Sequence, residues 1–226
     1  MGILYVWRNA YAKKKLVQKT TALLSAGVIS LVLATSAFAH VGDYHSGQYL
    51  SGATCNQSNL KFRVESSARN SILTSAVYSA GTQWNNISSK VNVSVVMAAS
   101  GMPTTGFYTV YGTSYDDGTY GELISRNAQG KIVSMDSNWY MVEISINNDP
   151  SAFSDSNAAR RTFIHEVGHA LKLKHPSANF SLSGHTYYGG LPKSVMNQGP
   201  PSSSKPWIAT TVEEHDEINI IGKWGA

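Results

Sequence analysis

Hydrophobic residues recur three or four positions apart in residues 70–87, which is the spacing of one face of a helix. Val77 and Trp84 belong to this series, which predicts an amphipathic helix with a buried apolar stripe. Elsewhere the apolar residues are β-branched or alternate with polar ones, and such runs predict strands. We place these strands at 61–65, 91–98, 107–111 and 139–147.

The last of these strands shows the clearest alternation. Val142, Ile144 and Ile146 fall on one side of it, and Glu143 and Ser145 fall on the other. Because successive side chains of a strand point to opposite faces, this order predicts one buried and one solvated face.

Residues that favour helix N-termini follow this strand, and they predict a second helix that begins close to Asp155, Ser156 and Asn157. Glycines and prolines make residues 176–206 irregular, and a last helix is predicted over 212–221. The expected fold is therefore α+β: a twisted mixed β-sheet packed by two long helices, then a small irregular C-terminal subdomain with one helix. The order of the strands does not follow from these patterns.

The first 39 residues have the features of a secretory signal peptide. Arg8 and four lysines precede a short apolar run, and Ala37-Phe38-Ala39 is an A-x-A cleavage sequence. The apolar run is too short to span a bilayer as a stable helix. We expect 1–39 to be a signal peptide, 40–60 an N-terminal arm and 61–226 a single domain. The protein would be secreted and extracellular, and the long basic leader is typical of a Gram-positive bacterium.

The leader also accounts for the positive charge of the chain. The whole sequence has 18 basic and 14 acidic residues, but five of the basic residues lie in the leader. The mature chain of about 187 residues is therefore nearly neutral, so it offers no strongly basic surface to nucleic acid or anionic membranes. Its length suits one domain with a sizeable core. We expect a monomer that binds no nucleic acid and, once the leader is removed, no membrane.

Three of the seven histidines lie in one short segment, FIHEVGHALKLKHP. His165 and His169 are four positions apart, so on a helix they share one face and can bind one metal ion. Glu166 lies beside them, where its carboxylate can accept a proton from a metal-bound water. His175 can join them only if the helix ends after His169 and the chain turns back. Three histidines and one open position are the ligand set of catalytic zinc.

This spacing is close to H-E-x-x-H-x-x-G-x-x-H, and Ser-Val-Met-Asn follows it at 194–197. In both features the chain resembles the metzincin metallopeptidases, and among them the matrixin-like secreted bacterial members. The resemblance implies that residues 61–226 form a zinc endopeptidase domain with a zinc cleft, which cleaves a protein or peptide substrate. It also implies the roles of five residues: zinc ligands His165, His169 and His175, general base Glu166, and Met196 in a tight turn beneath the metal.

One position departs from the family pattern, because Lys172 stands where the family has glycine. A sharp turn before His175 favours glycine, which adopts a left-handed backbone without a Cβ clash. Lysine in that conformation costs roughly 1 kcal/mol. From backbone strain alone, Lys172→Gly is expected to raise the melting temperature or leave it nearly unchanged.

Two other interpretations of the histidine motif stay open. In a zinc peptidase of another type, Glu213 or Glu214 supplies the third ligand and His175 is a bystander. In a non-catalytic secreted zinc-binding surface protein, the chain itself fills the fourth coordination position. The candidates for that fourth ligand are Cys55, His185 and His215.

Three further hypotheses rest on weaker signals. Cys55 is the single cysteine, so it forms no intramolecular disulfide, and its thiolate is a candidate for holding the enzyme latent on the zinc. Tyr187 and Tyr188 are candidates for supporting the oxyanion. Oxygen ligands in a glycine-containing loop suit calcium, and this chain has such a loop with Asp116, Asp117 and Glu122.

Overall fold

The computed structural model describes residues 42–53, 55–69, 71–115, 117–149, 151–153, 156–177, 187–188, 190–199 and 204–226, with the backbone alone at 71–76, 79 and 187–188. The chain divides into two units, Met1–Val41 and Gly42–Ala226. All described residues belong to the second unit, so the expected signal peptide lies outside them. No helix among the described residues is both long and apolar enough to cross a membrane.

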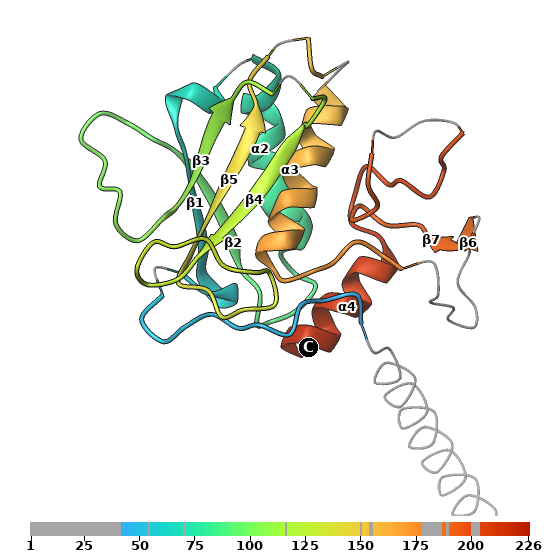
Figure 1. The fold of residues 1–226 in the computed structure, drawn as a ribbon. Helices are drawn as coiled ribbons and strands as arrows, with labels where there is room; N and C mark the ends of the chain where they lie inside the picture. The colour runs from blue at the N-terminus through green and yellow to red at the C-terminus, as the bar shows by residue number, and fades with distance from the viewer. Residues whose placement is uncertain are drawn as a thin grey trace, which may run out of the picture. The chain divides into compact units, whose positions relative to one another are not determined.

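A five-stranded mixed sheet is the centre of the second unit (Figure 1). Its strand order is β2-β1-β3-β5-β4. The strands β1, β2, β3 and β5 run parallel, whereas β4 pairs antiparallel with β5 and forms one edge. The strands are β1 (Leu60–Val64), β2 (Val93–Met97), β3 (Tyr108–Thr113), β4 (Gly121–Arg126) and β5 (Met141–Asn147).

Two helices, α2 (Ser71–Trp84) and α3 (Ser156–Ala170), lie behind the sheet in Figure 1. The ring of Phe62 in β1 packs 6.2 Å from that of Phe163 in α3. Trp84 joins the helices, because its indole N–H donates to the carbonyl of Ile164 at 3.1 Å. A third helix, α4 (Glu214–Trp224), and a two-stranded ribbon of β6 (Tyr187–Tyr188) and β7 (Leu191–Pro192) follow α3. The described residues thus combine a mixed sheet with α-helices, as the α+β expectation requires.

The predicted elements lie where the structure has them, with bounds that differ by up to three residues. The prediction of a solvated face on the strand at 139–147 was wrong for its last part. Ser145 and Asn147 are buried like their apolar neighbours, and the segment before β4 contacts Asn147, whose amide donates to the carbonyl of Thr119 at 2.9 Å. The strand β4 was missed. Glu122, expected in a loop, lies in this strand.

The expected N-terminal arm lies across the end of α3. Tyr44 forms an isolated β-bridge with Leu173, and Tyr49 forms one with Trp139. The backbone N–H of His45 donates to the carbonyl of Lys172 at 2.7 Å. The arm therefore holds, through backbone bonds, the chain segment that leaves α3.

Candidate metal centre

The turn after α3 brings His175 back to the helix. Lys172 has a φ of 74°, in the left-handed region. Its N–H donates to the carbonyl of His169 at 2.9 Å, and the N–H of Leu173 donates to that of Gly168 at 3.0 Å. These two bonds close a helix C-terminus in the Schellman arrangement, with Lys172 in the position that usually holds glycine. The predicted chain reversal is therefore present, with a lysine in the strained position.

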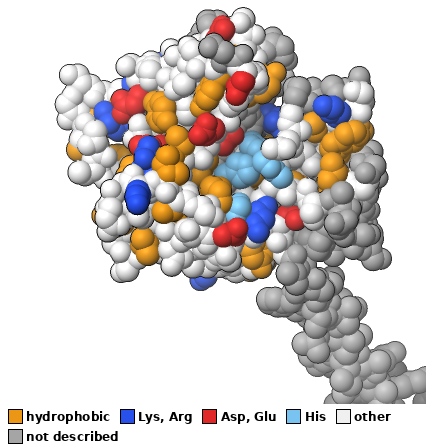
Figure 2. Space-filling model, viewed as in Figure 1, with side chains coloured by type: hydrophobic (Ala, Val, Ile, Leu, Met, Phe, Trp, Pro, Cys, Tyr) orange, Lys and Arg blue, Asp and Glu red, His pale blue; other side chains and the backbone are white. Residues whose placement is uncertain are grey.

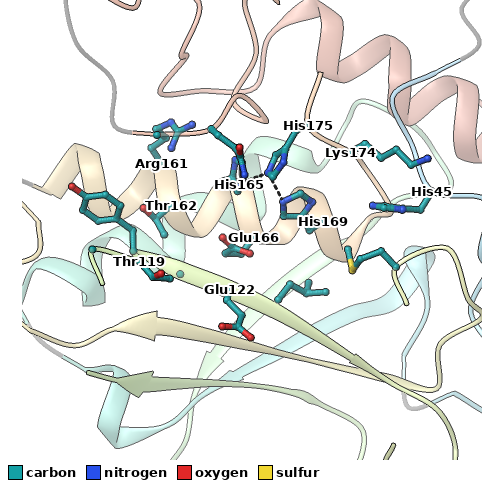
Figure 3. Close-up of a pocket in the computed structure, with 17 residues that line it drawn as sticks. His45, Thr119, Glu122, Arg161, Thr162, His165, Glu166, His169, Lys174 and His175 are labelled. Atoms are coloured by element: carbon teal, nitrogen blue, oxygen red, sulfur yellow. Dashed lines mark hydrogen bonds between the residues drawn. The ribbon is translucent and has the colours of Figure 1, made fainter. Parts of the chain in front are cut away.

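The three histidines of the motif meet at their Nε2 atoms (Figure 3). The Nε2 of His175 lies 3.1 Å from that of His165 and 3.1 Å from that of His169. Among the described residues, these three are the one group of three or more histidine, cysteine or acidic side chains placed closely enough to hold a metal ion. In a tetrahedral zinc site with Zn–N bonds of 2.0–2.1 Å, ligand nitrogens lie about 3.3 Å apart. The histidine cluster fits that geometry.

Backbone carbonyls fix the tautomers of two of these rings. The Nδ1–H of His165 donates to the carbonyl of Val195 at 2.9 Å, and that of His169 donates to Leu173 at 2.9 Å. Because a carbonyl can only accept, each Nδ1 carries the proton and each Nε2 is left with a lone pair. Such bonds on the outer nitrogen are typical of metal-binding histidines, since they orient the ring.

The electrostatics of the cluster also favour a cation. Burial lowers the pKa of His169 to about 3 and that of His165 well below its usual value, and neighbouring histidines add to both shifts. Burial lowers the pKa of His175 as well. The rings are therefore neutral, as metal ligands must be. The Nε2 of His175 can donate one proton at most, so at least one of its two close contacts brings two electron-rich nitrogens together without a proton between them. A metal ion among the three nitrogens removes that repulsion.

Glu166 lines the same cavity as these histidines and is almost completely buried. Burial, helped by the nearby Glu122 carboxylate and opposed by the Arg161 guanidinium, raises its pKa to about 8. A positive ion held by the histidines would lower this pKa, because an opposite charge stabilises the carboxylate. The edge strand β4 packs tightly here: a Cβ on Gly121 would lie 2.9 Å from Thr162 and 3.3 Å from the Glu166 side chain.

Met196 lies beneath the histidine helix. It is 1% exposed, and a Cβ on Gly168 would lie only 2.3 Å from its sulfur, so α3 and the 194–197 turn pack in direct contact. The hydroxyl of Ser194 accepts the N–H of Met196 at 2.8 Å and donates to the carboxylate of Asp216. The 194–197 turn, the predicted methionine turn, is thus tied to α4 and packs against the helix that carries His165 and His169.

A cavity of about 990 Å³ opens onto this cluster. Figure 2 shows histidine side chains in a hollow on this face of the molecule. The three histidines and Glu166 line the cavity, and so does Glu122 from β4. Two further lining residues, His45 and Arg161, were missed by the sequence analysis. Arg161 could have been found, because it precedes His165 by four positions and so shares its helix face; no sequence signal marks His45.

The structure places the residues of the rival interpretations elsewhere. Glu213 caps α4, and its carboxylate contacts the Lys193 ammonium at 2.8 Å. Glu214 is exposed on the first turn of α4. The buried Cys55 packs in the core, and the buried His215 faces Asp43 at 3.2 Å. None of these candidate ligands lines the histidine cavity, and His185 lies outside the described residues.

Two weaker hypotheses remain predictions. Asp116 and the side chains of Tyr187 and Tyr188 lie outside the described residues, so the structure does not test their roles. Asp117 is exposed, and its carboxylate accepts the N–H of Thr119 at 3.0 Å within the turn before β4. Glu122 lies in the strand that follows this turn.

Comparison of the chain with protein-family models finds no match, and comparison with curated proteins finds none that is similar.

Proposed function

We propose that the protein is a zinc-dependent endopeptidase. One observation supports this proposal above all: the Nε2 atoms of three neutral histidines lie close together. The buried Glu166 lies beside them, and all four side chains line an open cavity. Three nitrogen ligands leave one coordination position free, which is the arrangement of catalytic zinc and not of structural zinc. When bound, zinc supplies Lewis-acid chemistry and makes a water more acidic.

Each of the four residues has its own role in this proposal. His165, His169 and His175 hold the metal, and carbonyl partners orient the first two. Glu166 is no ligand: it accepts the proton of the attacking water and returns it to the leaving amine. Its burial excludes bulk water around the carboxylate, so the transferred proton is not lost to solvent.

The substrate is proposed to bind along β4. On one side this strand pairs with β5. On its other side Ser125 and Arg126 meet the 132–133 segment, whereas residues 118–123 line the cavity. An extended peptide can add to such an edge through main-chain hydrogen bonds, which give affinity without requiring a particular sequence. The scissile carbonyl would then lie in the cavity, close to the three histidines and the Glu166 carboxylate. In keeping with the leader sequence, we propose that the mature enzyme acts outside the cell, as a monomer and on proteins or peptides.

Glu166→Gln tests the proposal. Two properties of the purified mature chain are measured. Atomic absorption gives its zinc content, and an unstructured protein such as casein serves as the substrate for cleavage. We expect about one zinc per chain in both proteins and a loss of at least about 10²–10⁴-fold in rate for the variant, the usual contribution of a general base.

Two matched variants sharpen this test. Glu143→Gln makes the same change in a carboxylate of β5 that pairs with Arg126 at 2.7 Å and does not line the cavity, so it should stay active. Glu122→Gln alters the other carboxylate near the histidines. If Glu122→Gln abolishes cleavage while Glu166→Gln retains it, the assignment of the base is wrong. A zinc-loaded wild-type chain that cleaves no peptide bond refutes the proposed activity.

A further inference from the structure

Arg161 is a buried cation in the wall of the histidine cavity. It lies one helical turn before His165 on α3, so the two side chains leave the same helix face. It is only 6% exposed, yet it lines the cavity together with the metal-binding histidines. Arginine is rarely buried to this extent unless an anion or several acceptors compensate its charge.

Its hydrogen bonds occupy only part of the guanidinium group. The Nε–H donates to the carbonyl of Ala209 at 3.1 Å, and Nη2 donates to the carbonyls of Val195, at 3.3 Å, and Asn197. The carbonyl of Val195 also accepts the Nδ1–H of His165, so guanidinium and imidazole share one acceptor. No hydrogen bond joins Nη1 to any described residue. One edge of the guanidinium is therefore left over, beside a metal ligand.

No carboxylate among the described residues forms an ion pair with this guanidinium. Asp216 and Glu166 act on it at longer range. The carboxylate of Asp216 is already engaged, because it accepts from the Ser194 hydroxyl and from the N–H groups of Val195 and Glu213. Glu166 is needed as the base. Arg161 nevertheless stays charged at neutral pH, since burial lowers its pKa only to about 10.

We propose that Arg161 is a specificity-determining residue that binds a carboxylate of the substrate through its Nη1 edge. This inference rests on the proposed peptidase function. Arginine binds carboxylates with strong, directional hydrogen bonds, and the interaction gains strength where water is excluded. Figure 3 shows Arg161 on α3 and Glu122 on β4, so the helix presents a cation to the cavity and the edge strand presents an anion. An acidic substrate group is attracted to the Arg161 wall and repelled from β4.

The carboxylate can come from an acidic side chain or from the C-terminus of a peptide, and two peptide series distinguish these sources. The first has amidated ends and carries glutamate or glutamine at each position around the scissile bond in turn. The second has no acidic residue and ends in a free carboxylate or an amide at increasing distance from the scissile bond. For each pair, the ratio of the two kcat/KM values is measured with the zinc-loaded enzyme.

We expect a preference for the carboxylate of about tenfold to a hundredfold at one position of one series, the usual effect of hydrogen bonds to a charged group. Arg161→Gln should bring this ratio close to one. Arg161→Lys keeps the charge without the fork and should retain part of the preference. Arg160→Gln removes the same charge from the preceding position of α3, which does not line the cavity, and should leave the ratio unchanged.

The ratio is chosen because Arg161 also holds the carbonyls of the methionine turn, so its variants can lose stability. A loss of folded enzyme lowers both kcat/KM values equally and cancels in the ratio. A wild-type enzyme that cleaves peptides without any carboxylate preference overturns the inference and leaves the peptidase proposal standing. A preference that persists in Arg161→Gln overturns it too, and shows that the arginine only supports the turn. Failure of the zinc-loaded enzyme to cleave any peptide instead refutes the proposed function.

Discussion

Replacing Lys172 by glycine should destabilise the protein, although glycine suits the backbone there better. The lysine side chain is fully buried. Its ammonium donates to the carbonyls of Met135, at 3.2 Å, and Ser137, at 2.9 Å, and lies 3.1 Å from the centre of the Trp139 ring. The side chain thus ties the turn before His175 to the loop before β5. Strain considered alone gives the opposite expectation.

The two effects of Lys172→Gly can be compared in magnitude. Removing the left-handed strain gains about 1–2 kcal/mol, of which glycine's larger unfolded-state entropy takes back about 0.5–1 kcal/mol. With its pKa lowered to about 6, the Lys172 amine is mostly neutral at neutral pH, so its two hydrogen bonds contribute about 0.5–1.5 kcal/mol each. Burial of the apolar stem adds about 0.8 kcal/mol per methylene, and the cost of burying the amine offsets part of this sum. Lys172→Gly should therefore lower the free energy of unfolding by about 2–4 kcal/mol. For a domain of this size, that lowers the melting temperature by roughly 5–15 °C.

Calorimetry of the zinc-loaded proteins measures this change, with zinc content determined in parallel. Lys172→Met keeps most of the side-chain volume and lacks the ammonium, so it should lie between wild type and Lys172→Gly. Lys174→Met makes the same change two residues later, in a side chain that is 42% exposed and 3.6 Å from Asp136. It should cost less than about 1 kcal/mol. A rise in melting temperature for Lys172→Gly would show that the backbone strain outweighs the buried contacts, and would refute the reasoning.

The pH dependence of the same variants reports the charge of Lys172. Burial lowers its pKa to about 6, against 10.5 in the unfolded chain. Between these values the folded state binds fewer protons than the unfolded one, so stability increases as the pH rises. The stability of wild type relative to Lys172→Met should therefore increase between about pH 6 and 10. A flat difference would mean that the two carbonyls and Trp139 keep the ammonium charged.

Three shorter tests address the remaining expectations. N-terminal sequencing of the secreted chain should begin at His40; a start beyond residue 60 would indicate a removed pro-segment. Cys55→Ser should leave the activity and its time course unchanged, because the thiol is buried in the core; an activation lag that disappears in the variant would revive latency. His175→Ala should lose most of its zinc affinity, measured by competition with a chelator. Retention of zinc in His175→Ala, with loss in Glu213→Ala or Glu214→Ala, would favour the glutamate-ligand alternative.

Local sequence patterns were sufficient to predict the helices and strands whose hydrophobic residues recur with a clear period. The helix α2 and the strands β1, β2, β3 and β5 all carry apolar side chains at the spacing of their secondary structure, and their positions could be predicted. The strand β4 lacks such a run. Its residues GELISR mix charged and apolar side chains, and a glycine-containing turn precedes them. Pairing with β5 and contact with α3 at Gly121 define this strand, and neither is visible locally.

The histidine cluster was predictable for a related reason. Helical spacing places His165 and His169 together, and a helix end is the one way to bring His175 to them. The surroundings were not predictable, because they come from distant segments. Val195 orients His165, and His45 lines the cavity from the N-terminal arm. Contacts between residues 30 or more positions apart depend on tertiary packing, which no local pattern encodes.

The same distinction explains how a lysine can occupy a glycine position. The sequence shows only that Lys172 occupies a left-handed turn, where a side chain strains the backbone. Judged from the sequence, Lys172 therefore lowers the stability of the folded protein. In the fold, its carbonyl accepts the N–H of His45 and its ammonium reaches the carbonyl of Ser137. The backbone and the side chain of one residue thus join the arm, the loop before β5 and the turn that carries His175. Because an error of about 1 Å in a ligand's position can disrupt a metal site, contacts that fix this turn can compensate for its strain. The stability of the turn and the position of His175 should therefore change together when Lys172 is replaced.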